Sequence, residues 1–127
     1  MTSPKNLKYT REHEWVRIDG DEGTVGITEH AQELMTDIVF IELPEEGKVV
    51  VQGGNLAVVE SVKSVSDVLS PLSGVVIEVN KNLENSPELI NSDAYGEGWI
   101  AKIRVKDTKE LDVLMTAEEY DQFMEVL

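Results

Sequence analysis

The chain contains no cysteine among its 127 residues. This absence excludes a disulfide framework and a thiolate zinc site, and it is compatible with a reducing compartment. Histidine is scarce as well, because His13 and His30 are the only two. Neither histidine belongs to a His-Glu-x-x-His or His-x-x-x-His pattern, so they make a poor metal site. We therefore expect both histidines to lie at the surface or at helix caps.

Basic residues are also few, since 11 Lys and Arg stand against 25 Asp and Glu and give a net charge of −14. Binding of nucleic acid needs a basic surface, and so does binding of anionic membranes, so both partners are excluded. No apolar run is long enough to span a bilayer, and no secretory signal opens the chain. We expect a cytoplasmic protein. The acidic surface can speed docking onto partners with basic patches, although solubility alone also explains it.

Familiar catalytic motifs are missing too. There is no glycine-rich phosphate loop, no Gly-x-Ser-x-Gly elbow and no cysteine nucleophile. The sequence therefore predicts a protein that does not run a reaction by itself.

The patterns that are present predict a series of short strands. Residues 14–18 and 24–27 are rich in β-branched residues and flank a turn of glycine and aspartate, which predicts a hairpin. Thr28 is placed to cap a short helix after it. The apolar residues of that helix are expected to share one core-facing side, and they are Ile27, Ala31, Leu34 and Met35.

Further along, residues 37–43 are almost continuously apolar, so we expect a strand that is covered on both faces. Residues 99–105 alternate like a half-buried strand. Thr108 is predicted to begin a helix, and Thr116 with Glu119 forms a capping box that opens the last one. Short strands with helices only at the margins predict one mainly β domain over residues 1–127, a small sandwich or flattened barrel.

The chain is organised around residues 58–69, in which β-branched residues flank a short polar centre. This pattern predicts two strands that meet at a tight turn, with Lys63 at the bend. A lone lysine in a turn is usually only a solvated charge. The alternative is that its flexible stem presents an amine for another protein to modify.

The wider motif favours the second interpretation. The string Glu60-Ser-Val-Lys-Ser-Val-Ser-Asp67, followed by Ser70-Pro-Leu-Ser-Gly-Val-Val-Ile-Glu-Val-Asn80, resembles the lipoyl-lysine hairpin of the glycine cleavage H-protein family. Segments 13–16, 25–32, 37–44 and 98–99 are similar to that family in the same order. The chain departs from the family pattern at Ser64, where alanine is usual, and at Leu34, where some members have histidine.

The resemblance implies a barrel-sandwich hybrid with short peripheral helices and a C-terminal helix. It also implies a lipoyl group, joined as an amide to Lys63 by a lipoate-attaching enzyme. The lipoyl carrier would take the aminomethyl group of glycine from glycine decarboxylase (P protein) to the tetrahydrofolate-dependent aminomethyltransferase (T protein). Dihydrolipoyl dehydrogenase (L protein) would then reoxidise it, so the chain would be a non-catalytic component of a multienzyme system.

The resemblance also suggests roles for three acidic residues. Glu14 and Asp67 are candidates to line the cleft that holds the loaded arm, because a carboxylate forms strong charge-assisted hydrogen bonds with an ammonium group. Glu60, three residues before Lys63, is a candidate contact for the attaching enzyme. The alternative for each is a plain surface acid.

Other carriers fit less well. Biotinyl carriers show Met-Lys-Met, and lipoyl domains of 2-oxoacid dehydrogenases read Asp-Lys-Ala, whereas this chain has Val62-Lys63-Ser64. A lipoyl donor or scaffold for other lipoylated enzymes, and an unmodified adaptor, remain open alternatives.

Overall fold

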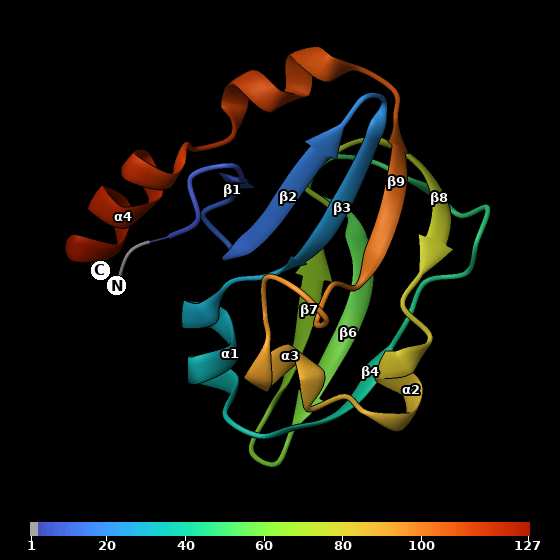
Figure 1. The fold of residues 1–127 in the computed structure, drawn as a ribbon, viewed down its shortest axis with the longest axis vertical. Coiled ribbons are helices and arrows are strands. Elements are labelled where there is room, and N and C mark those ends of the chain that lie inside the picture. The colour runs from blue at the N-terminus through green and yellow to red at the C-terminus, as the bar shows by residue number, and fades with distance from the viewer. Residues whose placement is uncertain (1–2) are drawn as a thin grey trace.

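The computed structural model describes residues 3–127. It contains a six-stranded sheet in the order β1-β2-β3-β9-β8-β5 and a three-stranded sheet in the order β4-β6-β7, both antiparallel (Figure 1). The strands are β1 (Lys8–Tyr9), β2 (Glu14–Asp19), β3 (Glu22–Ile27), β4 (Ile38–Glu42), β5 (Val49–Val50), β6 (Asn55–Ser61), β7 (Val65–Leu69), β8 (Gly74–Val79) and β9 (Ala101–Val105). The helices are α1 (Glu29–Met35), α2 (Asn82–Asn85), α3 (Leu89–Ser92), the 3-10 helix η1 (Thr108–Val113) and α4 (Ala117–Glu125).

The core lies between the two sheets. Alternate residues of the strands point inward, so the buried cluster is rich in β-branched and leucine side chains. Among its most buried members are Val25 and Ile103 of the larger sheet and Val59 of the smaller one. This arrangement confirms the predicted mainly β fold with short helices and a C-terminal helix.

The first predicted hairpin is confirmed as β2 and β3, with Gly20 and Asp21 at its turn. Trp15 on β2 faces Gly26 on β3, and a Cβ atom at Gly26 would lie only 2.6 Å from the indole ring. The glycine therefore makes room for the buried tryptophan, whose Nε1 donates a hydrogen bond of 3.0 Å to the carbonyl of Ala94. This contact fixes β2 against the segment that precedes β9.

The predicted helix cap is confirmed, because Thr28 Oγ1 accepts a hydrogen bond of 3.2 Å from the N–H of Ala31. The predicted core face of α1 is partly wrong, since Leu34 is 55% exposed. Gln32 is buried in its place, and its amide oxygen accepts a hydrogen bond from Asn91. The side of α1 that carries Leu34 borders an open cleft.

The expectation that residues 37–43 are covered on both faces is wrong. β4 belongs to the three-stranded sheet, whose inner face packs on the core while its outer face is open, so its outward side chains face solvent. Ile38 and Ile41 are buried, whereas Val39 is 51% and Phe40 is 54% exposed. A register shift between Ile38 and Phe40 explains why two successive residues are both exposed.

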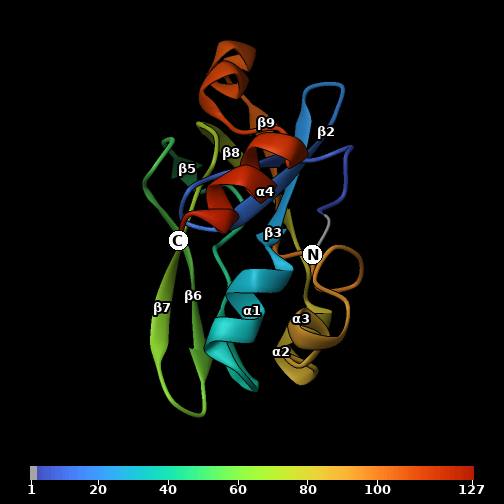
Figure 2. The ribbon, with the colours of Figure 1, turned by 90° about the vertical axis from the view of Figure 1, so that its left-hand side faces the viewer.

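The C-terminal segment forms the two predicted helices. The first is the 3-10 helix η1, which begins at Thr108 as predicted and is capped by Asp107. The capping box of α4 is confirmed, because Thr116 and Glu119 exchange both hydrogen bonds. α4 packs against β1 through a second buried cluster, in which Tyr9 and Tyr120 stack at 4.7 Å between ring centroids. Figure 2 shows α4 lying above α1. Of the helices in residues 3–127, none has the length and apolar character that crossing a bilayer requires.

Candidate functional site

The predicted lysine hairpin is confirmed as β6 and β7, and its turn is held by two serines. The last cross-strand pair is Glu60 with Val65. The N–H of Ser61 donates to the carbonyl of Ser64 at 2.8 Å, and Ser61 Oγ accepts from the N–H groups of Ser64 and Lys63 at 3.1 and 3.3 Å. Hydrogen bonds to the serine hydroxyl thus stabilise this turn, which lacks the glycine that such turns commonly contain.

Lys63 lies at the exposed tip of this hairpin. Figure 2 shows the tip protruding beyond the end of α1, away from the larger sheet. The ion pairs within residues 3–127 are Lys102 with Glu78 and Arg104 with Asp21, so Lys63 has no carboxylate partner in this part of the chain. Its amine is therefore accessible to a modifying enzyme.

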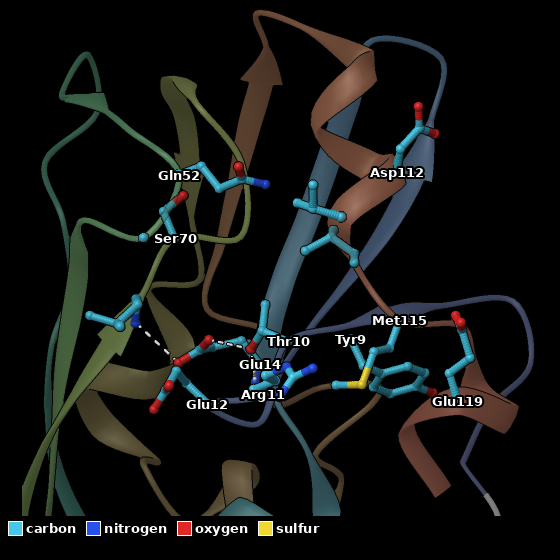
Figure 3. A pocket seen from close by; sticks show the side chains of 14 residues that line it. Tyr9, Thr10, Arg11, Glu12, Glu14, Gln52, Ser70, Asp112, Met115 and Glu119 are labelled. Atoms are coloured by element: carbon cyan, nitrogen blue, oxygen red, sulfur yellow. Dashed lines mark hydrogen bonds between the residues drawn. The ribbon is translucent and has the colours of Figure 1, made fainter. Parts of the chain in front are cut away.

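Glu14 is a buried carboxylate that is tied to the hairpin. The residue is 2% exposed, although its side chain is ionisable. Thr10 Oγ1 donates to Oε1 at 2.6 Å, and the N–H of Leu69 on β7 donates to Oε2 at 3.2 Å (Figure 3). Burial raises the pKa of Glu14, while the hydrogen bonds from Thr10 and Leu69 partly oppose that rise.

A cleft of about 160 Å³ lies between α1 and the hairpin, and we call it the arm cleft. Glu14 and the exposed Asp67 both border it, but their carboxylates are not brought together. Asp67 pairs with Val58, whereas the inward-facing Val59 pairs with Ser66, so the side chain of Asp67 lies on the outer side of the hairpin. The other lining residues are largely apolar, and they include Ala31, Leu34 and Met35 of α1 and Val59 and Val68 of the hairpin. A largely apolar cleft with a buried carboxylate among its lining residues suits a hydrocarbon chain with a cationic end.

Glu14 also borders a larger cavity of about 450 Å³ on its other side, which Figure 3 shows. This cavity lies beneath η1 and is lined by Arg11, Gln52 and Asp112 among others, but not by Asp67. Glu14 therefore forms part of the wall between two cavities. Thr10, which holds Glu14 in this wall, is a site residue that sequence reasoning missed. Its spacing of four residues from Glu14 is the only signal in the sequence.

Glu60 is not among the residues that line the arm cleft. Cross-strand register places it in one row with Phe40 on β4 and Val65 on β7, and all three are exposed. Successive strand side chains point to opposite faces, and Val59 points into the arm cleft, so this row lies on the outer face of the sheet. We call it the outer row.

The histidines were expected at the surface or at helix caps; both are half-buried, and His30 lies in the first turn of α1. Their ring centroids lie 4.7 Å apart, and His13 Nδ1 is 2.8 Å from the hydroxyl of Tyr120. Burial and the nearby His30 lower the pKa of His13, and Glu12 opposes this shift in part. Within the described part of the chain, no group of three or more His, Cys, Asp or Glu side chains is arranged to hold a metal ion.

Comparison with known proteins identifies the family. The family model described as glycine cleavage H-protein matches residues 7–126. A glycine cleavage system H protein of Symbiobacterium thermophilum is 55% identical over 120 residues, which are 94% of each chain. One from Shewanella oneidensis is 57% identical over 118 residues, 92% of each chain.

A solved structure supports the same assignment. The crystal structure of a glycine cleavage system H protein from Mycobacterium marinum is 38% identical to this chain and aligns with a TM-score of 0.86, covering 97% of this chain and 99% of the other. This likeness confirms the barrel-sandwich architecture that the sequence resemblance implied. The chain therefore belongs to the glycine cleavage H-protein family.

Proposed function

We propose that this chain is the lipoylated carrier of the glycine cleavage system, with Lys63 as the attachment site. The observation that carries the proposal is an exposed lysine without an ion-pair partner in residues 3–127, at the tip of a hairpin whose flank forms the arm cleft. The whole of residues 1–127 would act as one lipoyl-binding domain, because both buried clusters support the hairpin or the cleft beside it.

The residues of the site fit a lipoyl group. Amide formation needs an amine that an attaching enzyme can reach, and Lys63 is exposed at a tight turn. When bound, the lipoyl group supplies a disulfide that opens to accept the aminomethyl group of glycine. Leu34 and Met35 of α1 face Val59 of the hairpin across the cleft, so they would shield the cargo from water.

Glu14 and Asp67 would hold the ammonium end of the cargo. Glu14 contributes a buried carboxylate, whose interaction with a cation is weakly screened by solvent, whereas Asp67 is exposed and contributes less. No residue of the chain is assigned a catalytic role in this proposal. The chemistry would belong to glycine decarboxylase (P protein), aminomethyltransferase (T protein) and dihydrolipoyl dehydrogenase (L protein), which the carrier would meet in the cytoplasm without nucleic acid or membrane partners.

Intact mass spectrometry tests the attachment site. We expect the purified chain, incubated with lipoate, ATP and a lipoate-attaching enzyme, to gain the mass of one lipoyl group. Peptide mapping should place that mass on the peptide containing Lys63. An unchanged mass, or an adduct on another lysine, would contradict the proposal.

Glu60 is proposed to contact the attaching enzyme from the outer row. Its exposed carboxylate lies between Phe40 and Val65, next to the modified turn. We expect Glu60→Ala to slow lipoylation by about two- to fivefold, because an exposed ion pair contributes about 0.5–1 kcal/mol. Initial rates of mass gain measure the effect.

Glu42 provides the matched control for this test. It is an exposed acid on the same outer face, but it pairs with Val58 and so lies farther from the turn. Glu42→Ala removes the same charge from the chain. Equal rates for Glu60→Ala and Glu42→Ala would show that Glu60 has no specific role.

A further inference from the structure

The hydroxyl of Tyr120 joins two segments that are distant in the sequence. Tyr120 lies on α4 and is 2% exposed. Its oxygen is 2.8 Å from Nδ1 of His13 and 2.8 Å from Oγ1 of Thr28, while its ring stacks on Tyr9. Burial raises the pKa of Tyr120 to about 12, so that the hydroxyl keeps its proton at neutral pH.

Both partners of Tyr120 belong to walls of the arm cleft. His13 lines the cleft and directly precedes Glu14. Thr28 caps α1, the helix that supplies the opposite wall through Ala31, Leu34 and Met35. The N–H of Thr28 also donates to the carbonyl of His13 at 3.0 Å, so the two walls meet behind the cleft.

The segment that presents Glu14 needs such support. His13 has a φ of 72°, in the left-handed region that is unfavourable for a residue other than glycine. The Tyr120 hydroxyl can donate to one of its two partners, His13 Nδ1 and Thr28 Oγ1, and accept from the other, and the oxygen of Thr28 also accepts from the N–H of Ala31. These contacts link His13 Nδ1, the Tyr120 hydroxyl and the Thr28 hydroxyl, and they orient the turn before Glu14.

We propose that Tyr120 is a positioning residue of the arm cleft, whose hydroxyl fixes the wall that carries His13 and Glu14 against the wall formed by α1. The proposal rests on the proposed function, in which this cleft holds the cargo. It makes the C-terminal helix part of the site, although Tyr120 itself does not line the arm cleft.

Tyr120→Phe tests the proposal, because it removes the two hydrogen bonds and keeps the ring that stacks on Tyr9. In the unlipoylated chain, we expect amide hydrogen exchange at Leu69 and Ala31 to become about fivefold faster. These N–H groups donate to Glu14 and to Thr28, so they report on the two walls directly. In the lipoylated and loaded chain, loss of the aminomethyl group should also become about fivefold faster.

Tyr9→Phe is the matched control. It removes a buried hydroxyl from the other ring of the stack, where Tyr9 donates to the carbonyl of Pro4, and it leaves His13 and Thr28 untouched. Thermal unfolding of both variants measures their loss of stability. If Tyr9→Phe and Tyr120→Phe lose a comparable amount of stability, the amide of Leu69 in Tyr9→Phe should exchange no faster, relative to the other amides of the chain, than it does in the wild type.

Two outcomes would overturn the proposal. One is wild-type exchange at Leu69 and Ala31 in Tyr120→Phe, and the other is an equal effect of Tyr9→Phe, which would indicate a general loss of stability. Glu14→Ala separates this proposal from the proposed function. If Glu14→Ala leaves cargo loss unchanged, the storage role of the cleft fails, whereas faster loss in Glu14→Ala together with normal loss in Tyr120→Phe removes only the role of Tyr120.

Discussion

Replacing Lys63 by arginine is expected to abolish lipoylation and, with it, all support of glycine cleavage, while the fold stays intact. Arginine keeps the positive charge and a long exposed stem, but its guanidinium remains protonated and does not form the amide. The side chain is at an exposed tip, so the free energy of unfolding should change by less than about 0.5 kcal/mol. Intact mass and a reconstituted glycine cleavage assay with P, T and L proteins measure the two effects.

Lys81→Arg controls for the loss of a lysine elsewhere. Lys81 is also exposed, and it lies at the start of α2, away from the hairpin. This variant should be lipoylated and should support glycine cleavage like the wild type. Glycine cleavage at the wild-type rate in Lys63→Arg would refute the carrier function. A lipoylated wild-type chain that donates its lipoyl group to another enzyme but supports no glycine cleavage would instead favour the donor alternative.

The lysine hairpin could be predicted from sequence because its determinants are local. β-Branched residues on both sides of residues 61–66 specify two strands, and a short loop between them leaves little choice of topology. The hydrogen bonds of Ser61 and Ser64 that close the turn are also local in sequence. The cap of α1 and the capping box of α4 were predictable for the same reason.

The exposure of Leu34 and Phe40 could not be predicted, because hydrophobic periodicity assumes that apolar residues point inward. Leu34 follows the apolar spacing of α1 but borders the arm cleft, and Phe40 lies on the outer row beside the modified turn. Both apolar side chains are placed where a cargo arm or a partner protein would cover them. Exposure alone does not identify these two surfaces, because apolar residues elsewhere, such as Val49 and Val113, are exposed as well.

The environment of Glu14 and the role of Tyr120 depend on contacts between distant parts of the chain. Glu14 accepts its hydrogen bond from Leu69, 55 residues away, and Tyr120 meets His13 across 107 residues. The helical spacing of Tyr120 predicts only that it packs in the core, which it does. Nothing in the local sequence indicates that its hydroxyl supports the cleft.

Glu14→Gln is expected to speed loss of the aminomethyl group from the loaded carrier by about tenfold or more at neutral pH. A hydrogen bond to a charged group contributes about 1.5–3 kcal/mol, and glutamine removes that charge. Glutamine is the informative variant because it can still accept from Leu69 and donate to Thr10. Alanine would leave the N–H of Leu69 unpaired, at a cost of about 1–3 kcal/mol. Release of formaldehyde and ammonia over time measures the loss, and Asp67→Asn should have a smaller effect because Asp67 is exposed.

The pH dependence should distinguish a role in holding the cargo from a role in stability, because the two run in opposite directions. Only the ionised carboxylate pairs with the ammonium, so the advantage of the wild type over Glu14→Gln in retaining cargo should disappear as the pH falls through the pKa of Glu14. In the unloaded chain, burial raises this pKa above the ordinary 4.5. A raised folded-state pKa contributes stability that is fully present below the unfolded pKa and is lost as the pH rises through the folded one. Unloaded wild type should therefore lose stability relative to Glu14→Gln as the pH rises, which is the direction in which its retention of cargo improves. Retention should change at a lower pH than stability, because the paired ammonium favours the ionised carboxylate in the loaded chain. Equal cargo loss in the two proteins at every pH would show that Glu14 does not hold the cargo.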